Sequence, residues 1–245
     1  MVSTRGHPKE FPETPTRTPT TPTQSTPFRK GQWAHTPSNL TIIWLAISLP
    51  LVAWDAGYCM LRPHSMPGGS LHWPIWVPYE LYGKVDYIYG WKAFNEHNGF
   101  TAAQTFLNII ESGMYYYYLY VLYAYGKSSS AQGRGAPKNA GFLGEQRFVD
   151  GKMGALAVLV GYSAAVMTVS KTVLYWMNEY YSGFGNIGHN SIRDLIFLWI
   201  IPNGLWIVVP SYIIYVTGSE ILQGLSIAAG GATALNDDIS LVKTE

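Results

Sequence analysis

The last hydrophobic segment of the chain, residues 194–218, contains the stretch Asn203-Gly204-Leu205-Trp206-Ile207-Val208-Val209-Pro210. In a helix, Asn203 and Trp206 lie one turn apart, so the amide and the indole point from the same side of an otherwise apolar surface. Hydrocarbon offers an amide no hydrogen-bond partner. We therefore expect this side to face other helices or a ligand inside a membrane-embedded bundle.

The bulk composition points to the same environment. Of the 245 residues, 48% are hydrophobic and only 13% are charged, whereas globular domains carry about 25% charged residues. The net charge of +1 argues against the concentrated basic surface of a nucleic-acid binder, so no nucleic-acid partner is expected. The single cysteine, Cys59, excludes an internal disulfide and a cysteine-rich zinc site.

Four segments reach the roughly 20 apolar residues that cross a bilayer, at about 40–61, 101–125, 153–180 and 195–216. They predict an all-α membrane protein: a four-helix transmembrane bundle with an internal lipid cavity, formed by residues 39–218. Residues 1–38 are rich in Pro and Thr and have little apolar surface to bury, so they are expected to form a disordered tail. Residues 219–245 are expected to form a C-terminal tail.

The basic residues predict the orientation of such a bundle. With four spans, both termini and the loop 126–152 lie on one side of the membrane. That side holds eleven Lys and Arg residues, and the opposite side holds four, which are Arg62, Lys84, Lys92 and Arg193. The positive-inside rule therefore places both termini in the cytoplasm.

Each predicted span carries polar side chains at helical spacing. They are Asp55 with Tyr58 in the first span, Gln104, Asn108, Glu111, Ser112 and Tyr115 in the second, Lys171, Tyr175, Asn178 and Glu179 in the third, and Asn203 in the fourth. Polar groups in membranes most often bond one another across helices, and Gln104 and Asn108 are expected to do so. A charge at mid-bilayer costs at least about 2.5–3.5 kcal/mol on insertion scales, so Asp55 and Glu111 are assigned to function. Lys171 either pairs with one of these acids or contacts a substrate.

The long connection 62–100 is rich in Trp and Tyr, side chains that favour the membrane interface. It includes Trp73, Trp76, Tyr79, Tyr82 and Tyr89, and we expect it to form an ordered lid across the mouth of the bundle. Four histidines fall in loops without a metal-ligand spacing, so no metal site is predicted.

The pattern Asn-x-Leu-Trp-x-Val-x-Pro at 203–210 resembles the last conserved helix of the emopamil-binding protein family, whose shared module is the EXPERA domain. Val173-Leu174-Tyr175 followed by Glu179, then Gly183-Phe184 and Gly188-His189, is similar to the third helix of that family and the loop after it. Asp55 and Glu111 fall where the family has acids. The resemblance covers about residues 40–220 and implies a multi-pass endoplasmic-reticulum protein with a sterol-sized cavity.

The best-known activity of this family shifts a ring double bond of a sterol. The reaction needs an acid that protonates an alkene, stabilisation of a carbocation, and a base. The resemblance implies that Asp55 and Glu111 transfer protons, that the Trp206 indole faces the cation, and that Asn203 orients the substrate. The other substrate-binding candidates are Tyr58, Asn108, Tyr115, Lys171, Tyr175 and Glu179. The reaction requires no cofactor.

A second function remains open beside the isomerase. The sterol isomerases of the family carry a histidine one turn before the first acid, where this chain has Leu51, and a hydroxyl residue one turn after the second acid, where it has Met114. The aspartate at 55 is closer to the sigma-2 receptor branch, whose members bind sterols and cationic amphiphiles. The alternatives are an isomerase of a sterol or polycyclic terpenoid lipid and a binding or trafficking protein for such lipids. Small residues of the third span, such as Ala157 and Ala164, could also support a homodimer.

Overall fold

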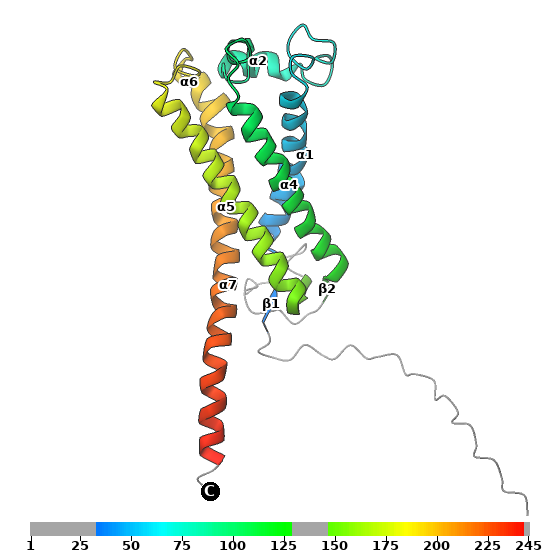
Figure 1. Cartoon of the computed structure of the whole chain (residues 1–245), viewed down its shortest axis with the longest axis vertical. Coiled ribbons are helices and arrows are strands. Elements are labelled where there is room, and N and C mark those ends of the chain that lie inside the picture. Colours follow the sequence, from blue (N-terminus) through cyan, green and yellow to red (C-terminus); the bar gives the residue numbers. More distant parts are fainter. Residues whose placement is uncertain (1–32, 129–146, 243–245) are drawn as a thin grey trace, which may run out of the picture. The chain divides into compact units, whose positions relative to one another are not determined.

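The computed structural model describes residues 33–128 and 147–242, with side chains up to Gly230. This part of the chain is mostly helical (Figure 1). Its helices are α1 (Asn39–Met60), α2 (Pro78–Val85), α3 (Trp91–Asn95), α4 (Phe100–Tyr125), α5 (Gly151–Tyr181), α6 (Ile192–Asp194), the π-helix η2 (Leu195–Ile200) and α7 (Ile201–Val242). The predicted tail up to residue 32 and most of the loop 126–152 lie outside the described residues.

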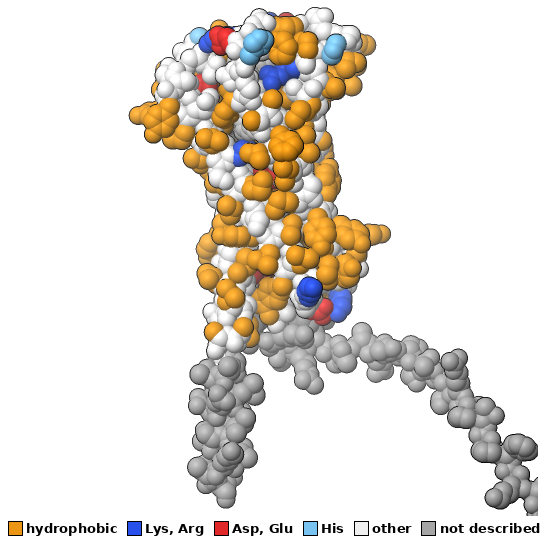
Figure 2. Space-filling model, in the orientation of Figure 1, with side chains coloured by type: hydrophobic (Ala, Val, Ile, Leu, Met, Phe, Trp, Pro, Cys, Tyr) orange, Lys and Arg blue, Asp and Glu red, His pale blue; other side chains and the backbone are white. Residues whose placement is uncertain are grey.

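Three helical segments in the described part are long and apolar enough to cross a membrane. They are α1, α5 and the segment Ile192–Gly230, which joins α6 and η2 to the first part of α7. Their outward-facing side chains are large and apolar, among them Ile47, Leu159, Phe197 and Val208, each more than half exposed. On the face shown in Figure 2, hydrophobic side chains extend over the middle of the helices, and charged side chains gather mainly at the two ends. These features fit a lipid bilayer.

The second predicted span, 101–125, is also a single helix, α4, of 26 residues. Its apolar character is lower than that of the other three because it carries the polar stripe of the second predicted span and a run of tyrosines at 115–118. It packs between α1 and α5, and α5 in turn packs against α7 (Figure 1). The predicted starts of the four long helical segments therefore lie within a few residues of the observed starts. Three of these segments are long and apolar enough to be candidate membrane spans.

The core between these helices depends on small residues of α5. Ala157, Ala164 and Ala165 are fully buried against tyrosines of α4. A Cβ on Gly161 would come within 3.1 Å of the Tyr118 ring. Small side chains allow helices to approach closely in a membrane, where packing replaces the hydrophobic effect as the attraction between them.

A small sheet closes one end of the helices. Strand β3 (Arg147–Asp150) lies between β1 (Ala34–His35) and β2 (Lys127–Ser128) and pairs with both in antiparallel register, with His35 opposite Val149. His35 lies beneath α7, where its Nδ1 is 2.5 Å from Glu220 Oε2 and its Nε2 is 2.9 Å from the Tyr118 hydroxyl. This end of the protein is therefore held by a buried polar cluster.

The last helix continues beyond the predicted end of the bundle. The sequence placed the end of the transmembrane domain at Gly218, and that boundary stays a prediction; the helix itself, α7, runs on to Val242. Glu220 is only 1% exposed, because its carboxylate contacts His35 and its backbone carbonyl accepts a bond from the Trp33 indole at 3.0 Å. Contacts with residues nearly 190 positions earlier in the chain thus fix this turn of the helix, and no local pattern could indicate them.

The connection between α1 and α4, residues 61–99, is ordered as predicted and is called the lid below. It carries α2 and α3 and lies at the end of the helices opposite the sheet (Figure 1). Indole bonds join it to α1: Trp76 donates to the Trp54 carbonyl at 3.2 Å, and Trp54 donates to the Ile75 carbonyl at 2.9 Å. Ser65 also donates to the Tyr58 carbonyl at 2.6 Å. These bonds attach the lid to the end of α1.

Candidate functional site

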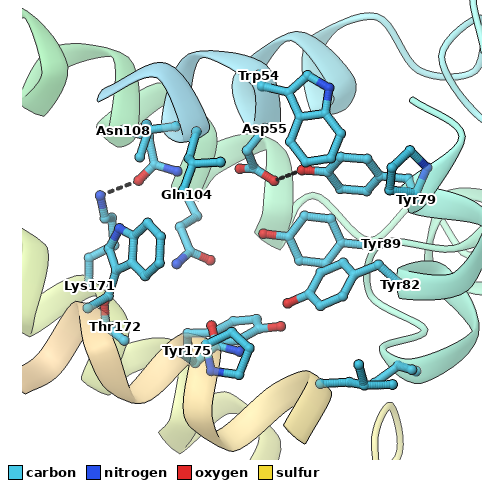
Figure 3. A pocket seen from close by; sticks show the side chains of 18 of the residues that line it. Trp54, Asp55, Tyr79, Tyr82, Tyr89, Gln104, Asn108, Lys171, Thr172 and Tyr175 are labelled. Atoms are coloured by element: carbon cyan, nitrogen blue, oxygen red, sulfur yellow. Dashed lines mark hydrogen bonds between the residues drawn. The ribbon is translucent and has the colours of Figure 1, made fainter. Parts of the chain in front are cut away.

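A cavity of about 390 Å³ lies beneath the lid, between α1, α2, α4, α5, η2 and α7. Its aromatic lining consists of Trp54, Tyr79, Tyr82, Tyr89, Tyr175 and Trp206, and its polar side chains include Asp55, Gln104, Asn108, Lys171, Thr172 and Asn203. Figure 3 shows most of these side chains pointing into a common space. An apolar and aromatic wall with a few polar groups is typical of a site for a small organic ligand.

Asp55 supplies a carboxylate to this cavity from α1. One oxygen, Oδ1, accepts a hydrogen bond from the Tyr79 hydroxyl at 2.5 Å (Figure 3). The Tyr79 ring stacks on Tyr58 with a centroid distance of 3.8 Å and tilts against Trp54 at 4.8 Å. Aromatic packing thus fixes the phenol, and the phenol fixes the carboxylate.

Lys171 of α5 lies in the wall formed with α4. Its Nζ donates to Glu111 Oε2 at 2.7 Å and also to Asn108 Oδ1. Lys171 is 8% exposed and Glu111 is 4% exposed, so the pair is removed from solvent on both sides. A buried pair of this kind is strongly coupled, because each charge would be uncompensated without the other.

Asp86 is the central group of a third polar cluster, where the lid contacts α5 and η2. The carboxylate is fully buried and accepts bonds from the Trp199 indole at 2.8 Å, from the Ile88 amide at 3.1 Å and from the Tyr175 hydroxyl. Burial raises the pKa of Asp86, and these three hydrogen bonds oppose that shift. Since Tyr175 lines the cavity, Asp86 sets the position of part of the cavity wall.

The π-helix η2 places Trp199 in this cluster. The Ile201 amide bonds back to the Ile196 carbonyl, five residues earlier, and Pro202 has no amide to continue an α-helical ladder. The Trp199 carbonyl accepts a bond from the Asn203 side chain at 2.8 Å. Single π-helical turns in longer helices occur often at functional sites, and here the turn directs an indole toward the lid.

The structure brings six of the predicted site residues to the cavity. They are Asp55, Asn108, Lys171, Tyr175, Asn203 and Trp206. Trp206 also packs edge-on against Trp44 of α1, with ring centroids 5.1 Å apart.

The other four predicted site residues do not line the cavity. Glu111 is turned toward Lys171, Tyr58 donates to the Tyr89 carbonyl at 2.8 Å, and Tyr115 lies 3.2 Å from the Thr168 hydroxyl within the core. Glu179 is fully buried and accepts a bond from Asn186 at 2.6 Å near the lid end of α5. The expected proton-transfer pair is therefore divided: Asp55 faces the cavity and Glu111 does not.

Sequence reasoning missed the contribution of the lid to this site. Tyr79, Tyr82 and Tyr89 line the cavity, whereas the sequence predicted a lid over the bundle without naming any of its residues as part of the site. Asp86 was not singled out at all. Its one sequence signal is an acid between Val85 and Tyr87 in an aromatic stretch that has few other charges.

Among the described residues, no three His, Cys, Asp or Glu side chains come together as metal ligands would. Comparison of the chain with protein-family models, with curated proteins and with solved structures found no match.

Proposed function

We propose that this membrane protein binds an amphiphilic lipid of sterol or terpenoid size in the cavity beneath the lid, with a polar group of the lipid at Asp55. The observation that carries the proposal is the composition of the cavity wall: six aromatic side chains and several aliphatic ones surround a single carboxylate. Its volume of about 390 Å³ falls within the range of small-molecule sites, roughly 300–1,000 Å³.

Asp55 is suited to anchor the polar end of such a lipid. The bond from Tyr79 uses Oδ1, which leaves the second oxygen to accept from a hydroxyl or an amine. A charge-assisted hydrogen bond in a dry site is roughly twice as strong as a neutral one. The carboxylate would therefore fix the orientation of the lipid, while the aromatic wall supplies most of the buried area.

The same proposal includes α4 as a fourth transmembrane helix. Its polar residues Asn108 and Glu111 are directed to Lys171 of α5, and its outward residues include Phe106, Ile109 and Tyr120, each close to half exposed or more. A transmembrane helix is stable in a bilayer when its polar groups face other helices and its apolar groups face the lipid. The resemblance to the EXPERA domain adds to this proposal a sterol-sized cavity and an endoplasmic-reticulum location, and the distribution of basic residues adds cytoplasmic termini.

A second candidate function is isomerisation of the bound lipid by way of a carbocation. It is favoured by the presence of Asp55 and Trp206 in one cavity, which would supply a proton and a π face for the cation. The pairing of Glu111 with Lys171 takes the other expected carboxyl away from the cavity. Asp55 would then have to deliver one proton and remove another, and for this reason binding is the primary proposal.

Equilibrium binding of a fluorescent sterol to the detergent-purified protein tests the primary proposal. We expect saturable binding that Asp55→Asn weakens by about tenfold or more, because the charged acceptor is lost. Glu80→Gln is the matched control, since Glu80 lies on the outside of α2 and pairs with Lys84 in solvent. Equal affinity of the two variants would exclude a role for Asp55.

Incubation with a mixed sterol and terpenoid extract in deuterated water tests the second candidate. Deuterium bound to carbon in lipids treated with the wild type, and absent with Asp55→Asn, would establish proton transfer. A retained but unlabelled lipid would restrict the function to binding.

A further inference from the structure

The cavity carries opposite charges on two of its walls. Asp55 comes from α1, and Lys171 comes from α5. In the view of Figure 3, Lys171 and Asn108 lie on one side of the cavity, Asp55 and Tyr79 lie on another, and the Gln104 side chain extends into the space between them. A ligand that fills this space would contact both an anion and a cation.

Lys171 has a hydrogen-bond donor to offer such a ligand. An ammonium group has three N–H donors, and the bonds to Glu111 and Asn108 account for two. No third protein acceptor for Nζ occurs in the described part of the chain, and Lys171 is part of the cavity lining. Two acceptors on α4 thus hold the ammonium in place and leave one N–H for an oxygen of the ligand.

Gln104 lies one helical turn from Asn108 and adds a second polar group. Its Oε1 is buried and has no hydrogen-bond partner among the described residues. The two ends of an amide are exchanged by rotation of the group, so Gln104 can present either its oxygen or its NH₂ to the cavity. The residue as a whole is half-buried and lines the cavity, so a polar group of a ligand there is a suitable partner for its amide.

We propose that the ligand is a polycyclic oxo-lipid carrying a β,γ-unsaturated ketone, and that Asp55 and Lys171 together move its double bond into conjugation through a dienolate. This inference rests on the proposed lipid binding and extends it to a substrate class. Asp55 is the proton carrier, and Lys171 with Gln104 donates to the ketone oxygen.

The reaction balances without any other reactant. The Asp55 carboxylate removes a proton from the carbon between the carbonyl and the alkene, and the C–H electron pair moves into a dienolate whose negative oxygen accepts from Lys171. The Asp55 carboxylic acid then returns the proton to the γ-carbon, the carbonyl re-forms, and the double bond lies in the α,β position. No oxidant or reductant takes part, and Asp55 ends as it began.

Charge explains why these residues favour a dienolate over a carbocation. Glu111 compensates the net charge of the Lys171 ammonium, but the N–H that faces the cavity still presents its positive end, which stabilises a negative oxygen and not a carbocation. A dienolate develops negative charge, for which a fixed ammonium and an amide donor act as an oxyanion hole. One carboxylate suffices because the same group removes and returns the proton, so the diversion of Glu111 to Lys171 is consistent with the mechanism.

A steroid with a β,γ-unsaturated ketone provides a direct assay, because its conjugated product absorbs in the near ultraviolet. We expect turnover by the full-length protein in detergent. Asp55→Asn should lower kcat by about 10²- to 10⁴-fold, as for loss of a general base. The double variant Lys171→Met, Glu111→Leu, which leaves no unpaired charge, should lower kcat by about 10²- to 10³-fold, as for loss of an oxyanion donor. Lys152→Met, at an exposed lysine of the same helix, and Glu80→Gln are the controls.

A binding measurement separates this inference from the lipid binding on which it rests. A phenolic steroid, whose phenolate resembles the dienolate, should bind the wild type more tightly than the matching cyclohexanol steroid. That preference should disappear in the Lys171→Met, Glu111→Leu variant while the alcohol still binds. Binding of both steroids without preference and without turnover of the ketone would overturn the dienolate mechanism and leave lipid binding intact. Failure of every steroid to bind would overturn both.

Discussion

Replacement of Lys171 by methionine tests the buried charge pair that shapes the cavity wall. The substitution keeps an unbranched side chain that is one atom shorter, but it leaves the Glu111 carboxylate, 4% exposed, without its cation and Asn108 without its donor. Removing one partner of a buried pair destabilises a protein by about 3–5 kcal/mol. At about 1.4 kcal/mol for each factor of ten, the unfolding equilibrium constant should rise by about 10²- to 10⁴-fold.

The matched variant removes both charges. In Lys171→Met, Glu111→Leu no charge is left uncompensated, and apolar replacements of a buried pair are often neutral or stabilising. The double variant should therefore regain most of the stability lost by Lys171→Met. With Glu111→Leu, the set forms a double-mutant cycle whose coupling energy isolates the pair.

Reversible unfolding in mixed detergent micelles, followed by far-ultraviolet circular dichroism, measures these free energies. Lys152→Met, at a lysine exposed near the start of α5, should leave the unfolding free energy within about 0.5 kcal/mol of the wild type, as for most surface substitutions. Hydrogen bonds between membrane helices average about 0.6 kcal/mol. A coupling energy no larger than that value would refute the assignment of Lys171 and Glu111 as a tightly coupled pair.

Three further predictions concern the lid, the sheet end and the helix core. Burial raises the pKa of Asp86 above its ordinary value of 3.8, so the folded state binds this proton more tightly than the unfolded state. The free energy of unfolding should therefore fall as pH rises from about 4 through the raised pKa. Asp86→Asn should flatten this pH dependence in unfolding titrations, and an unchanged slope would contradict the assignment. Glu220→Leu leaves the β1 histidine and a backbone amide without their acceptor. It should lower the free energy of unfolding by at least about 2 kcal/mol and speed hydrogen exchange of the β1 amides. Exchange as slow as in the wild type would show that the cluster does not hold the strand. Gly161→Leu should destabilise the protein by about 1–3 kcal/mol, because the new side chain would overpack against the Tyr118 ring. Gly113→Ala should be neutral or stabilising, because a Cβ there meets nothing within 4 Å. Equal changes in the free energy of unfolding for the two variants would disprove the close contact at Gly161.

The positions of the long helices followed from local sequence. The predicted segments at 40–61, 101–125 and 153–180 match α1, α4 and α5 within about two residues at each end, because the length of an apolar run and the polar residues at its ends are properties of neighbouring positions. The polar periodicity within these segments also predicted which sides face inward. Asp55, Lys171 and Asn203 reach the cavity for this reason.

Tertiary structure alone decided how these inward sides are used. Glu111 and Asp55 look alike in the sequence, yet one contacts Lys171 and the other faces the cavity, because the relative rotation of α4 and α5 determines which groups meet. The turn of α7 just past Gly218 is fixed by the contact between Glu220 and His35, which lie 185 residues apart.

The lid is the clearest example of side chains whose positions depend on tertiary contacts and not on local sequence. The sequence by itself determined that this segment is aromatic and ordered, and that the protein around it is helical and apolar. That Tyr79 bonds Asp55 and that Asp86 joins Tyr175 and Trp199 was decided by how the lid folds back onto the helices. Side chains in an irregular segment have no fixed period, so their direction comes from packing against distant residues.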